Sequence, residues 1–298
     1  MAAKRTMKKK ASKKRYAVQR HIEFNPSATP GAKQIIDAPR FLSEVNHRLY
    51  RQSRVYKLKV NQISVPKNNE DIDVYVLRDT WMLQKAYQMA KMQFDENTKQ
   101  ERSGMSPVNI ARWNDFRISL TPADGVSYSA LSPVVTNNNT LGGTTLALGE
   151  FVDSLVTRED GVDMSFGLFG LANSRFGILD EYDKTADVDS DPANTVSGSN
   201  ISAYGVLDDD NDDGSRSHLQ NAGNAPPYDP EGLGSATMFR KVAQLGSTSG
   251  TQKTTTGFFE APLGFVLIKV NAEASAAEYE IEMAPGDYKG VAATNYLE

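Results

Sequence analysis

The chain has 298 residues, 39% of them apolar, and a formal net charge of −4. It contains no cysteine and three scattered histidines, which excludes disulfides, thiolate metal sites and cysteine nucleophiles. No G-x-S-x-G motif, phosphate-binding loop or dinucleotide fingerprint occurs, so we expect a protein that is not an enzyme and needs no cofactor. No apolar run approaches transmembrane length, so no membrane partner is expected.

The first twenty residues form a basic arm without a single acidic residue. So few apolar side chains cannot offset the entropy of ordering, and we predict a disordered arm that neutralises nucleic-acid phosphates. The run KKKASKKR would also serve as a nuclear localisation signal, read by an import receptor. The basic residues of the arm are Lys4, Arg5, Lys8, Lys9, Lys10, Lys13, Lys14, Arg15 and Arg20.

The charge is divided unevenly along the chain. Residues 1–60 hold sixteen Lys or Arg against three acids, whereas the remaining residues hold seventeen against thirty-four. This asymmetry indicates a nucleic-acid-facing end and a body that faces something else. Because the basic charge continues through Lys33 and Arg40 to Lys59, we expect the arm to be continuous with one basic face of the body.

The segment after the arm, residues 21–40, contains three prolines and is predicted to be a linker. This places the arm and linker at 1–40 and one folded domain at 41–298, including an acidic excursion (180–232) and a C-terminal tail (284–298). A short amphipathic helix is expected over 41–52, where apolar residues recur every four positions. Its polar face carries Arg48 and Arg51, which extend the basic region inward.

The remaining elements are mostly strands. One strong helix is predicted over 79–100, capped by Asp79 or Thr80, with an apolar stripe that is expected to be core. The run Phe265–Val270 predicts a central strand covered on both faces. Such a pattern predicts a mainly β fold, a single jelly-roll β-sandwich with one prominent helix. The predicted strands are 53–65, 72–77, 112–120, 146–157, 163–171, 201–207, 236–245, 257–271 and 278–283.

The acidic excursion 180–232 holds thirteen Asp or Glu against Lys184 and Arg216. Within it, Asp209, Asn211 and Asp213 occupy the first, third and fifth positions of a calcium-loop pattern, with Gly214 at the sixth. The twelfth position is a glutamine, and a solvated, self-repelling loop is the simpler interpretation. Calcium therefore stays a candidate ligand at these residues only.

The order of motifs resembles a known family. The arm, then HRLYRQSRVYKLKV, then DVYVLRDTWMLQKAYQMAKMQF and the closing PGDYKGV together resemble capsid proteins of small circular Rep-encoding single-stranded DNA (CRESS-DNA) viruses. The resemblance implies a jelly-roll subunit that assembles with copies of itself into an icosahedral virion, formed in the host nucleus. It also implies that Lys4–Arg20 bind a single-stranded DNA genome and that Arg48, Arg51 and Arg54 line the inner surface.

Two other functions remain open on the sequence. The first is a non-viral nuclear nucleic-acid-binding or chaperone protein with a basic tail and an acidic loop. The second is a calcium-dependent β-sandwich binding module, which the acidic excursion would suit.

Overall fold

The chain folds as a mainly β structure. The computed structural model describes residues 18–27, 29–63, 71–104, 115–120, 128–136, 143–145, 153–157, 163–170, 175–186, 238–246, 253–271 and 278–297. These ranges hold seventeen strands and three helices. None of the described helices combines the length and the apolar character that crossing a bilayer requires.

The helices are α1 (Ala38–Asn46), α2 (Trp81–Ser103) and α3 (Ile178–Ala186). The strands are β1 (His21–Phe24), β2 (Lys33–Asp37), β3 (Arg54–Gln62), β4 (Asp71–Leu77), β5 (Ser129–Ala130), β6 (Val134–Thr136), β7 (Gly143–Thr145), β8 (Leu155–Thr157), β9 (Asp163–Gly167), β10 (Arg175–Gly177), β11 (Phe239–Gly246), β12 (Phe259–Pro262), β13 (Phe265–Val270), β14 (Tyr279–Met283), β15 (Pro285–Gly286), β16 (Gly290–Val291) and β17 (Ala293–Asn295).

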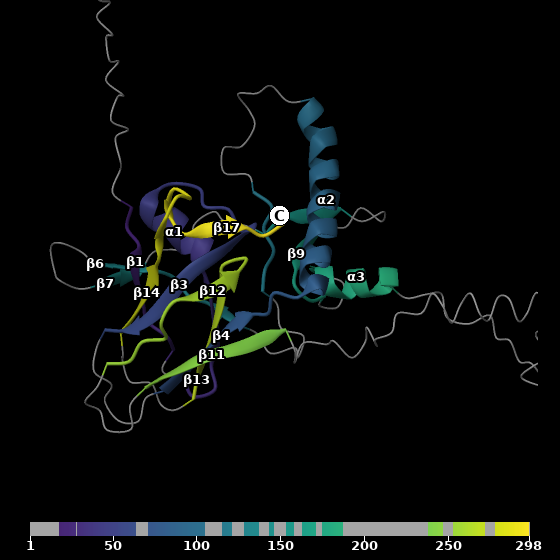
Figure 1. Cartoon of the computed structure of the whole chain (residues 1–298). Helices are drawn as coiled ribbons and strands as arrows, with labels where there is room; N and C mark the ends of the chain where they lie inside the picture. The colour runs from purple at the N-terminus through teal and green to yellow at the C-terminus, as the bar shows by residue number, and fades with distance from the viewer. Residues whose placement is uncertain are drawn as a thin grey trace, which may run out of the picture.

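Two large sheets carry the architecture (Figure 1). A seven-stranded sheet has the order β12-β3-β14-β1-β6-β7, with β17 also paired to β3. A five-stranded sheet has the order β11-β4-β13-β2-β5. Consecutive strands alternate between the two sheets from β1 to β4 and again from β11 to β14, and the long connection from β4 to β11 holds strands β5 to β10.

Eight of these strands pair in a nested pattern. The first, β1, pairs with the last, β14; β2 pairs with β13, β3 with β12, and β4 with β11, all antiparallel. Two further antiparallel pairs, β14 with β3 and β13 with β4, join these four hairpin-like pairs into the two sheets. One long antiparallel ribbon rolled onto itself has this pairing.

The main core lies between the two sheets, because alternate residues of each strand point inward. Ile22 and Phe24 of β1 and Val60 of β3 pack there against Ile268 of β13 and Val74 of β4, and all five are at most 1% exposed. The intervening residues of β1 and β3 are half-buried or exposed.

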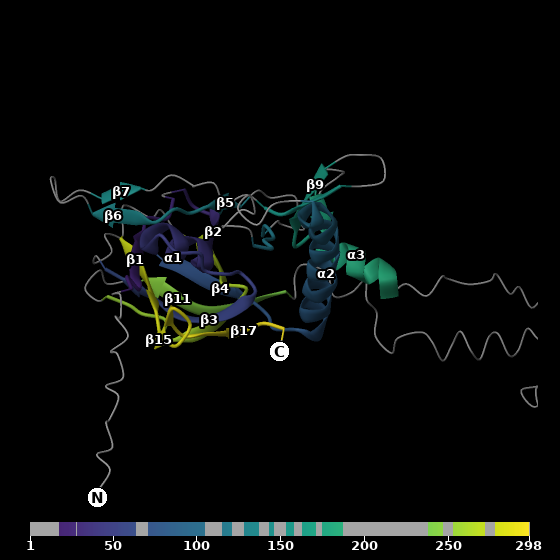
Figure 2. The same cartoon turned by 90° about the horizontal axis from the view of Figure 1, so that it is seen from above.

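A second core covers the outer face of the five-stranded sheet. Phe265 and Leu267 of β13 point into it, together with Leu83 and Tyr87 of α2. Because Val266 of the same strand lies in the main core, β13 is covered on both faces, as predicted. Figure 2 shows α2 standing between the sheets and α3.

Residues 21–40 do not form the predicted linker. They contain β1 and β2, one strand in each large sheet, and the start of α1. The prolines do not prevent this, because Pro39 occupies the first turn of α1, where a missing N–H costs nothing. Asp37 caps α1 by accepting from the Arg40 N–H at 3.1 Å. The helix therefore begins before the expected residue 41, and it ends at Asn46 before His47, whose φ is 48°.

Of the other predicted elements, some match the structure and some do not. The strands expected at 53–65, 72–77 and 278–283 are β3, β4 and β14, and α2 matches the predicted helix. In the predicted strand 112–120, the described residues 115–120 make one isolated bridge, Ser119 to Gly167. Their apolar side chains pack under α2 instead. The strand 201–207 lies outside the described residues, as does the acidic excursion beyond α3.

The stretch 257–271 is divided by a tight turn that generates a testable contrast. Gly264 (φ 73°) approaches α1 so closely that a Cβ would lie 2.2 Å from Cδ of Pro39. Gly257 has the same φ of 73° but nothing within 4 Å of a Cβ. We expect Gly257→Ala to cost about 1 kcal/mol for the left-handed backbone, and Gly264→Ala about 3 kcal/mol because overpacking is added. Denaturant melts of both variants test this, and equal losses would contradict the Pro39 contact.

Candidate nucleic-acid interface

Most of the predicted arm lies outside the described residues. This holds for its basic residues from Lys4 to Arg15, and also for the calcium candidates Asp209, Asn211 and Asp213. Arg20, Arg48, Arg51 and Arg54 are described. The site is therefore built from the base of the arm and from the residues around it.

The base of the arm is anchored by three consecutive residues. Val18 packs against Gly290, where a Cβ would meet the Val18 side chain at 2.7 Å. Gln19 exchanges two hydrogen bonds with Asn46: its N–H donates to Oδ1 at 2.8 Å, and its carbonyl accepts from Nδ2 at 3.0 Å. The Arg20 carbonyl accepts from the Met283 N–H at 2.9 Å. Val18 and Gln19 therefore lie between the end of α1 and the β15–β16 hairpin.

A group of basic and aromatic side chains surrounds this point. It joins the segment between α1 and β3 to the C-terminal hairpin, 237 to 240 residues later. We name it the arm-base cluster, and its members are Arg48, Arg51, Arg54, Tyr288 and Lys289.

Tyr288 is the centre of the arm-base cluster. The guanidinium carbon of Arg54 lies 3.7 Å from the centroid of its ring, a stacked cation–π contact. Its hydroxyl oxygen accepts from the Arg51 N–H at 3.1 Å. Its ring makes T-shaped contacts with the rings of Tyr50 and Tyr56, whose centroids lie 6.0 and 6.4 Å away. One tyrosine thus holds two of the three predicted arginines at one place.

Lys289 closes the arm-base cluster from the hairpin side. Its φ of 50° turns the chain, and its Nζ donates to the carbonyl of Leu49. The Lys289 carbonyl accepts from the Tyr50 hydroxyl at 3.1 Å. Burial raises the pKa of Tyr50, although the neighbouring charge of Arg48 opposes the shift. The phenol therefore stays protonated at neutral pH and keeps donating this hydrogen bond.

Some cations of the arm-base cluster bind backbone carbonyls, and one is exposed to solvent. Arg54 also donates to the carbonyl of Ala293 at 3.3 Å, and Lys289 is held by Leu49, so both fasten the hairpin. Arg51 contributes its backbone to the cluster, because its carbonyl accepts from Tyr56 at 2.6 Å while its side chain is exposed. Of these residues, Arg51 has the exposed guanidinium, which suits it to contact a phosphate.

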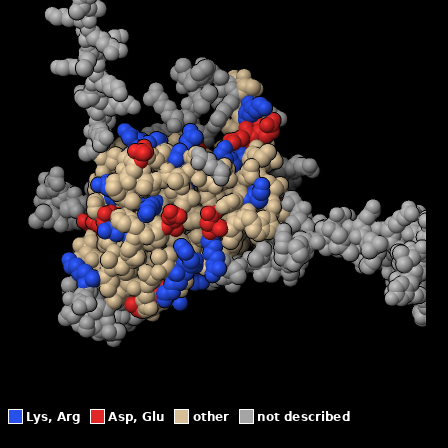
Figure 3. All heavy atoms as spheres, viewed as in Figure 1, with Lys and Arg blue, Asp and Glu red and all other residues tan. Residues whose placement is uncertain are grey.

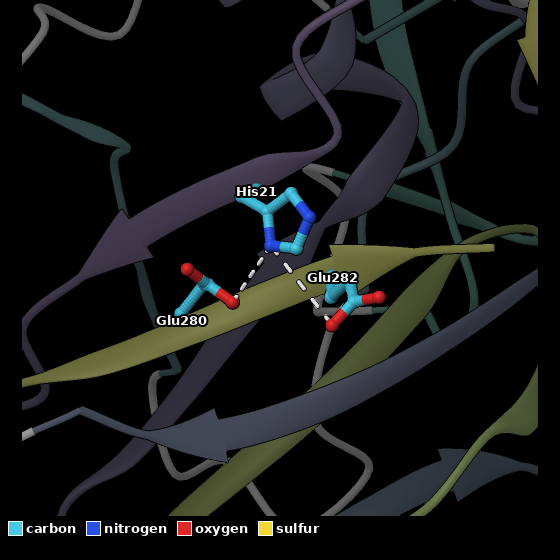
Figure 4. Close-up of side chains that lie close together, drawn as sticks. All are labelled: His21, Glu280 and Glu282. Carbon is cyan, nitrogen blue, oxygen red and sulfur yellow. Dashed lines mark hydrogen bonds and ion pairs between the residues drawn. The ribbon is translucent and has the colours of Figure 1, made fainter. Parts of the chain in front are cut away.

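A second polar group lies on the outer face of the seven-stranded sheet (Figure 4). His21 Nδ1 lies 3.0 Å from Oε1 of Glu280 and 3.9 Å from Oε2 of Glu282. These three residues could hold a metal ion by distance alone. However, Lys59 forms an ion pair with Glu282 at 2.8 Å, and Asn61 donates to both carboxylates at 3.1 and 3.3 Å. We interpret the group as a cross-strand ladder that links β1, β14 and β3.

The expected continuous basic face is not formed. Arg40 is 8% exposed, pairs with Glu44 at 2.9 Å and donates to the Leu131 carbonyl, so its charge is used inside the fold. Lys59 is paired with Glu282. Figure 3 shows both signs of charge interspersed over the face of β3, β14 and β12. Among the described residues, basic charge at the arm is local to the arm-base cluster.

The structure brings Arg48, Arg51 and Arg54, which the sequence singled out, together with Tyr288 and Lys289, which the sequence prediction did not include. The motif GDYKG, part of the closing segment PGDYKGV, forms a tight turn, because β15 and β16 pair around it. The available signal was an aromatic residue next to a lysine between two glycines, and in the fold both side chains are half-buried.

Comparisons with protein-family models, with curated proteins and with solved structures find no match. A function for this chain is therefore inferred from its own residues and strand pairing.

The ladder yields a prediction on pH. Burial raises the pKa of Glu282, but hydrogen bonds from Lys59 and Asn61 and the charges of Lys59 and His21 outweigh it. The pKa therefore lies below its ordinary 4.5. A lowered carboxyl pKa stabilises the fold above the ordinary value, and this contribution is lost as pH falls through the folded pKa. We expect Glu282→Gln to cost about 0.5 kcal/mol at pH 7 and less as pH falls below 4.5.

Denaturant melts across this pH range measure the effect. The control is Lys59→Met, since in that background Glu282→Gln should cost less at pH 7. If the loss in unfolding free energy caused by Glu282→Gln does not change with pH or with the Lys59→Met background, the contacts of Glu282 in the ladder do not stabilise the fold.

Proposed function

We propose that this chain is a viral capsid subunit that assembles with copies of itself into an icosahedral shell and packages a single-stranded DNA genome. We further propose that its two sheets form a jelly roll, and that the protein is similar in both respects to the CRESS-DNA capsid proteins whose motifs it resembles. Its location would then be the virion, after assembly in the host nucleus.

The nested strand pairing is the observation that carries the proposal. A jelly roll has eight strands in two antiparallel sheets and occurs in viral capsid domains. Folding a ribbon of eight strands pairs the first with the eighth, the second with the seventh, the third with the sixth and the fourth with the fifth. The pairs β1–β14, β2–β13, β3–β12 and β4–β11 have this order. The extra sheet β8–β9–β10 and α2 belong to the long connection between the fourth and fifth strands.

The arm supports the packaging part. Nine cations that each neutralise one phosphate of a single strand give a log–log salt slope of about −6 at most. One arm therefore binds weakly at physiological salt, but many arms inside one shell act on the same strand at high effective concentration. The arm-base cluster lies beside Val18–Arg20, and there Arg51 would add a phosphate contact from the body to those of the arm.

The decisive experiment compares the full chain with a variant that lacks residues 1–17, so that the anchored Val18–Arg20 remain. We expect both proteins to form closed particles in electron micrographs, and only the full chain to carry nucleic acid by its absorbance ratio. A full-length control with the Lys and Arg of 4–15 changed to Gln separates charge from length and should also assemble empty.

Two results would contradict the proposal. One is a full chain that stays monomeric, or forms small fixed oligomers, at every salt concentration and pH, as the nuclear-chaperone alternative predicts. The other is an arm-less shell that contains as much nucleic acid as the full chain.

The interface on the body has a separate test. Arg51→Gln in the full chain removes one phosphate contact, so the salt slope for a single-stranded oligonucleotide should shrink by about 0.7. Arg240→Gln is the matched control, because Arg240 is an exposed arginine on β11, in the other sheet. Binding titrations at several salt concentrations give both slopes, and an unchanged slope for Arg51→Gln would remove this residue from the interface.

A further inference from the structure

The outer face of α2 carries an unusual share of the exposed apolar surface. Six large apolar side chains are exposed among the described residues, and three of them lie on this helix. They are Trp81, Met89 and Met92, which are 48%, 46% and 64% exposed, and the ring of Trp81 also packs against Tyr182 of α3. The opposite face of α2 packs into the second core through Leu83 and Tyr87. Figure 1 shows the C-terminal half of α2 extending beyond the sheets.

Four exposed residues form a narrow line along this outer face. Lys85, Met89, Met92 and Glu96 follow one another at spacings of four, three and four residues. At about 100° per residue these positions fall within an arc of about 60°. From the N-terminal to the C-terminal end of α2, the line is Lys, Met, Met, Glu. Its spacings of four, three and four residues are the same when it is followed from the other end. Two copies of this line, placed side by side in opposite directions, therefore pair Lys with Glu at both ends and Met with Met in the middle.

We propose that α2 is a contact between two copies of this chain, packed antiparallel about a two-fold axis that passes the helix between Ala90 and Lys91. In this arrangement Met89 of one copy packs against Met92 of the other, twice. Lys85 of each copy lies opposite Glu96 of the other, also twice. A two-fold contact uses the same patch on both copies, which requires a self-complementary surface.

The chemistry of the line selects this arrangement. A parallel pairing in the same register would place Lys85 against Lys85 and Glu96 against Glu96, and like charges across an interface are costly. Methionine suits the centre because its unbranched side chain adapts its shape to a facing helix. Lys85 and Glu96 are separated by about 16 Å along one helix, at about 1.5 Å per residue. They therefore cannot satisfy each other within a single copy.

The ion pairs already present on α2 leave this contact open. Lys91 pairs with Asp95 at 2.5 Å, beside the line. Lys99 lies 3.7 Å from Glu96, but both side chains are more than 60% exposed, at 77% and 65%, so this pair is weak. Four side chains from each copy bury less area than a stable isolated dimer needs. The contact therefore matters most where it is repeated, as in a shell, and to that extent it rests on the proposed function.

Charge reversal tests the contact directly. Lys85→Glu and Glu96→Lys each place like charges together, and we expect each to weaken association about tenfold. The double variant Lys85→Glu/Glu96→Lys restores opposite charges across the two-fold axis and should recover association. Sedimentation and particle yield give the readout, with thermal melts to confirm that each variant folds. The matched control is Lys91→Glu/Asp95→Lys, which swaps a pair beside the line and should leave association unchanged.

Cysteine trapping tests the register independently, because the chain has no cysteine of its own. A mixture of Met89→Cys and Met92→Cys proteins should form a disulfide-linked pair faster than either protein alone, since a disulfide needs Cα atoms within about 7 Å. The control is Lys99→Cys, because in the proposed register position 99 of one copy lies far from position 99 of the other. Equal trapping in all samples would overturn the proposed register.

The outcomes separate this inference from the proposed function. Shells that form normally with Lys85→Glu and Glu96→Lys would overturn the α2 contact and leave the capsid proposal standing. A dimer that responds to charge reversal and is rescued by the double variant, in a protein that never forms shells, would support the contact and contradict the capsid proposal. Impaired association that the double variant fails to recover would also overturn the pairing of Lys85 with Glu96.

Discussion

The antiparallel pairing of β1 with β14 is the contact on which the rest of the structure depends. It joins the first described strand to a strand more than 250 residues later, with His21 and Glu280 lying 259 positions apart. Because β14 also pairs with β3, this contact sets the middle of the seven-stranded sheet. It also fixes Arg20 against Met283, and so determines where the basic arm leaves the body. The pairing of β1 with β14 therefore determines both the order of the sheet and the position of Arg20.

The C-terminal hairpin combines a structural role with a charged surface. Tyr288 receives a stacked guanidinium, a backbone hydrogen bond and two aromatic edges, which is more than a surface turn requires. The same contacts draw Arg51 and Arg54 together at the base of the arm. The cations of Arg54 and Lys289 fasten the hairpin, so the arm-base cluster exposes less positive charge than the sequence suggests.

Periodicity made part of the fold predictable. The helix α2, the strands β3 and β4 and the doubly covered β13 all follow from the spacing of their apolar residues, which is a local signal. Residues 21–40 were misjudged because their prolines suggested a linker, whereas Pro39 is placed where helices accept it. The stretch 112–120 was expected to be a strand because its apolar alternation is real, but the described part serves packing under α2 and forms no ladder.

The arm-base cluster was only half predictable, because its two halves meet through contacts between residues about 240 positions apart. The arginines could be named from charge alone. Their convergence on Tyr288 depends on the left-handed turn at His47 and on the β15–β16 hairpin, and neither has a signal in the arginine segment itself. The buried ion pair of Arg40 with Glu44 was likewise invisible, because charge counting treats every arginine as surface.

The nested order of the strands also dictates how the protein can be made. During translation β1 leaves the ribosome before the other described strands, while its partner β14 emerges more than 250 residues later. The nascent β1 therefore stays without its partner while more than 250 residues are synthesised, and long-range pairing of this kind forms slowly. The innermost pair, β4 with β11, and then β3 with β12 can form before it. The ribbon is thus expected to close from its middle outwards, and the arm becomes anchored in the final step.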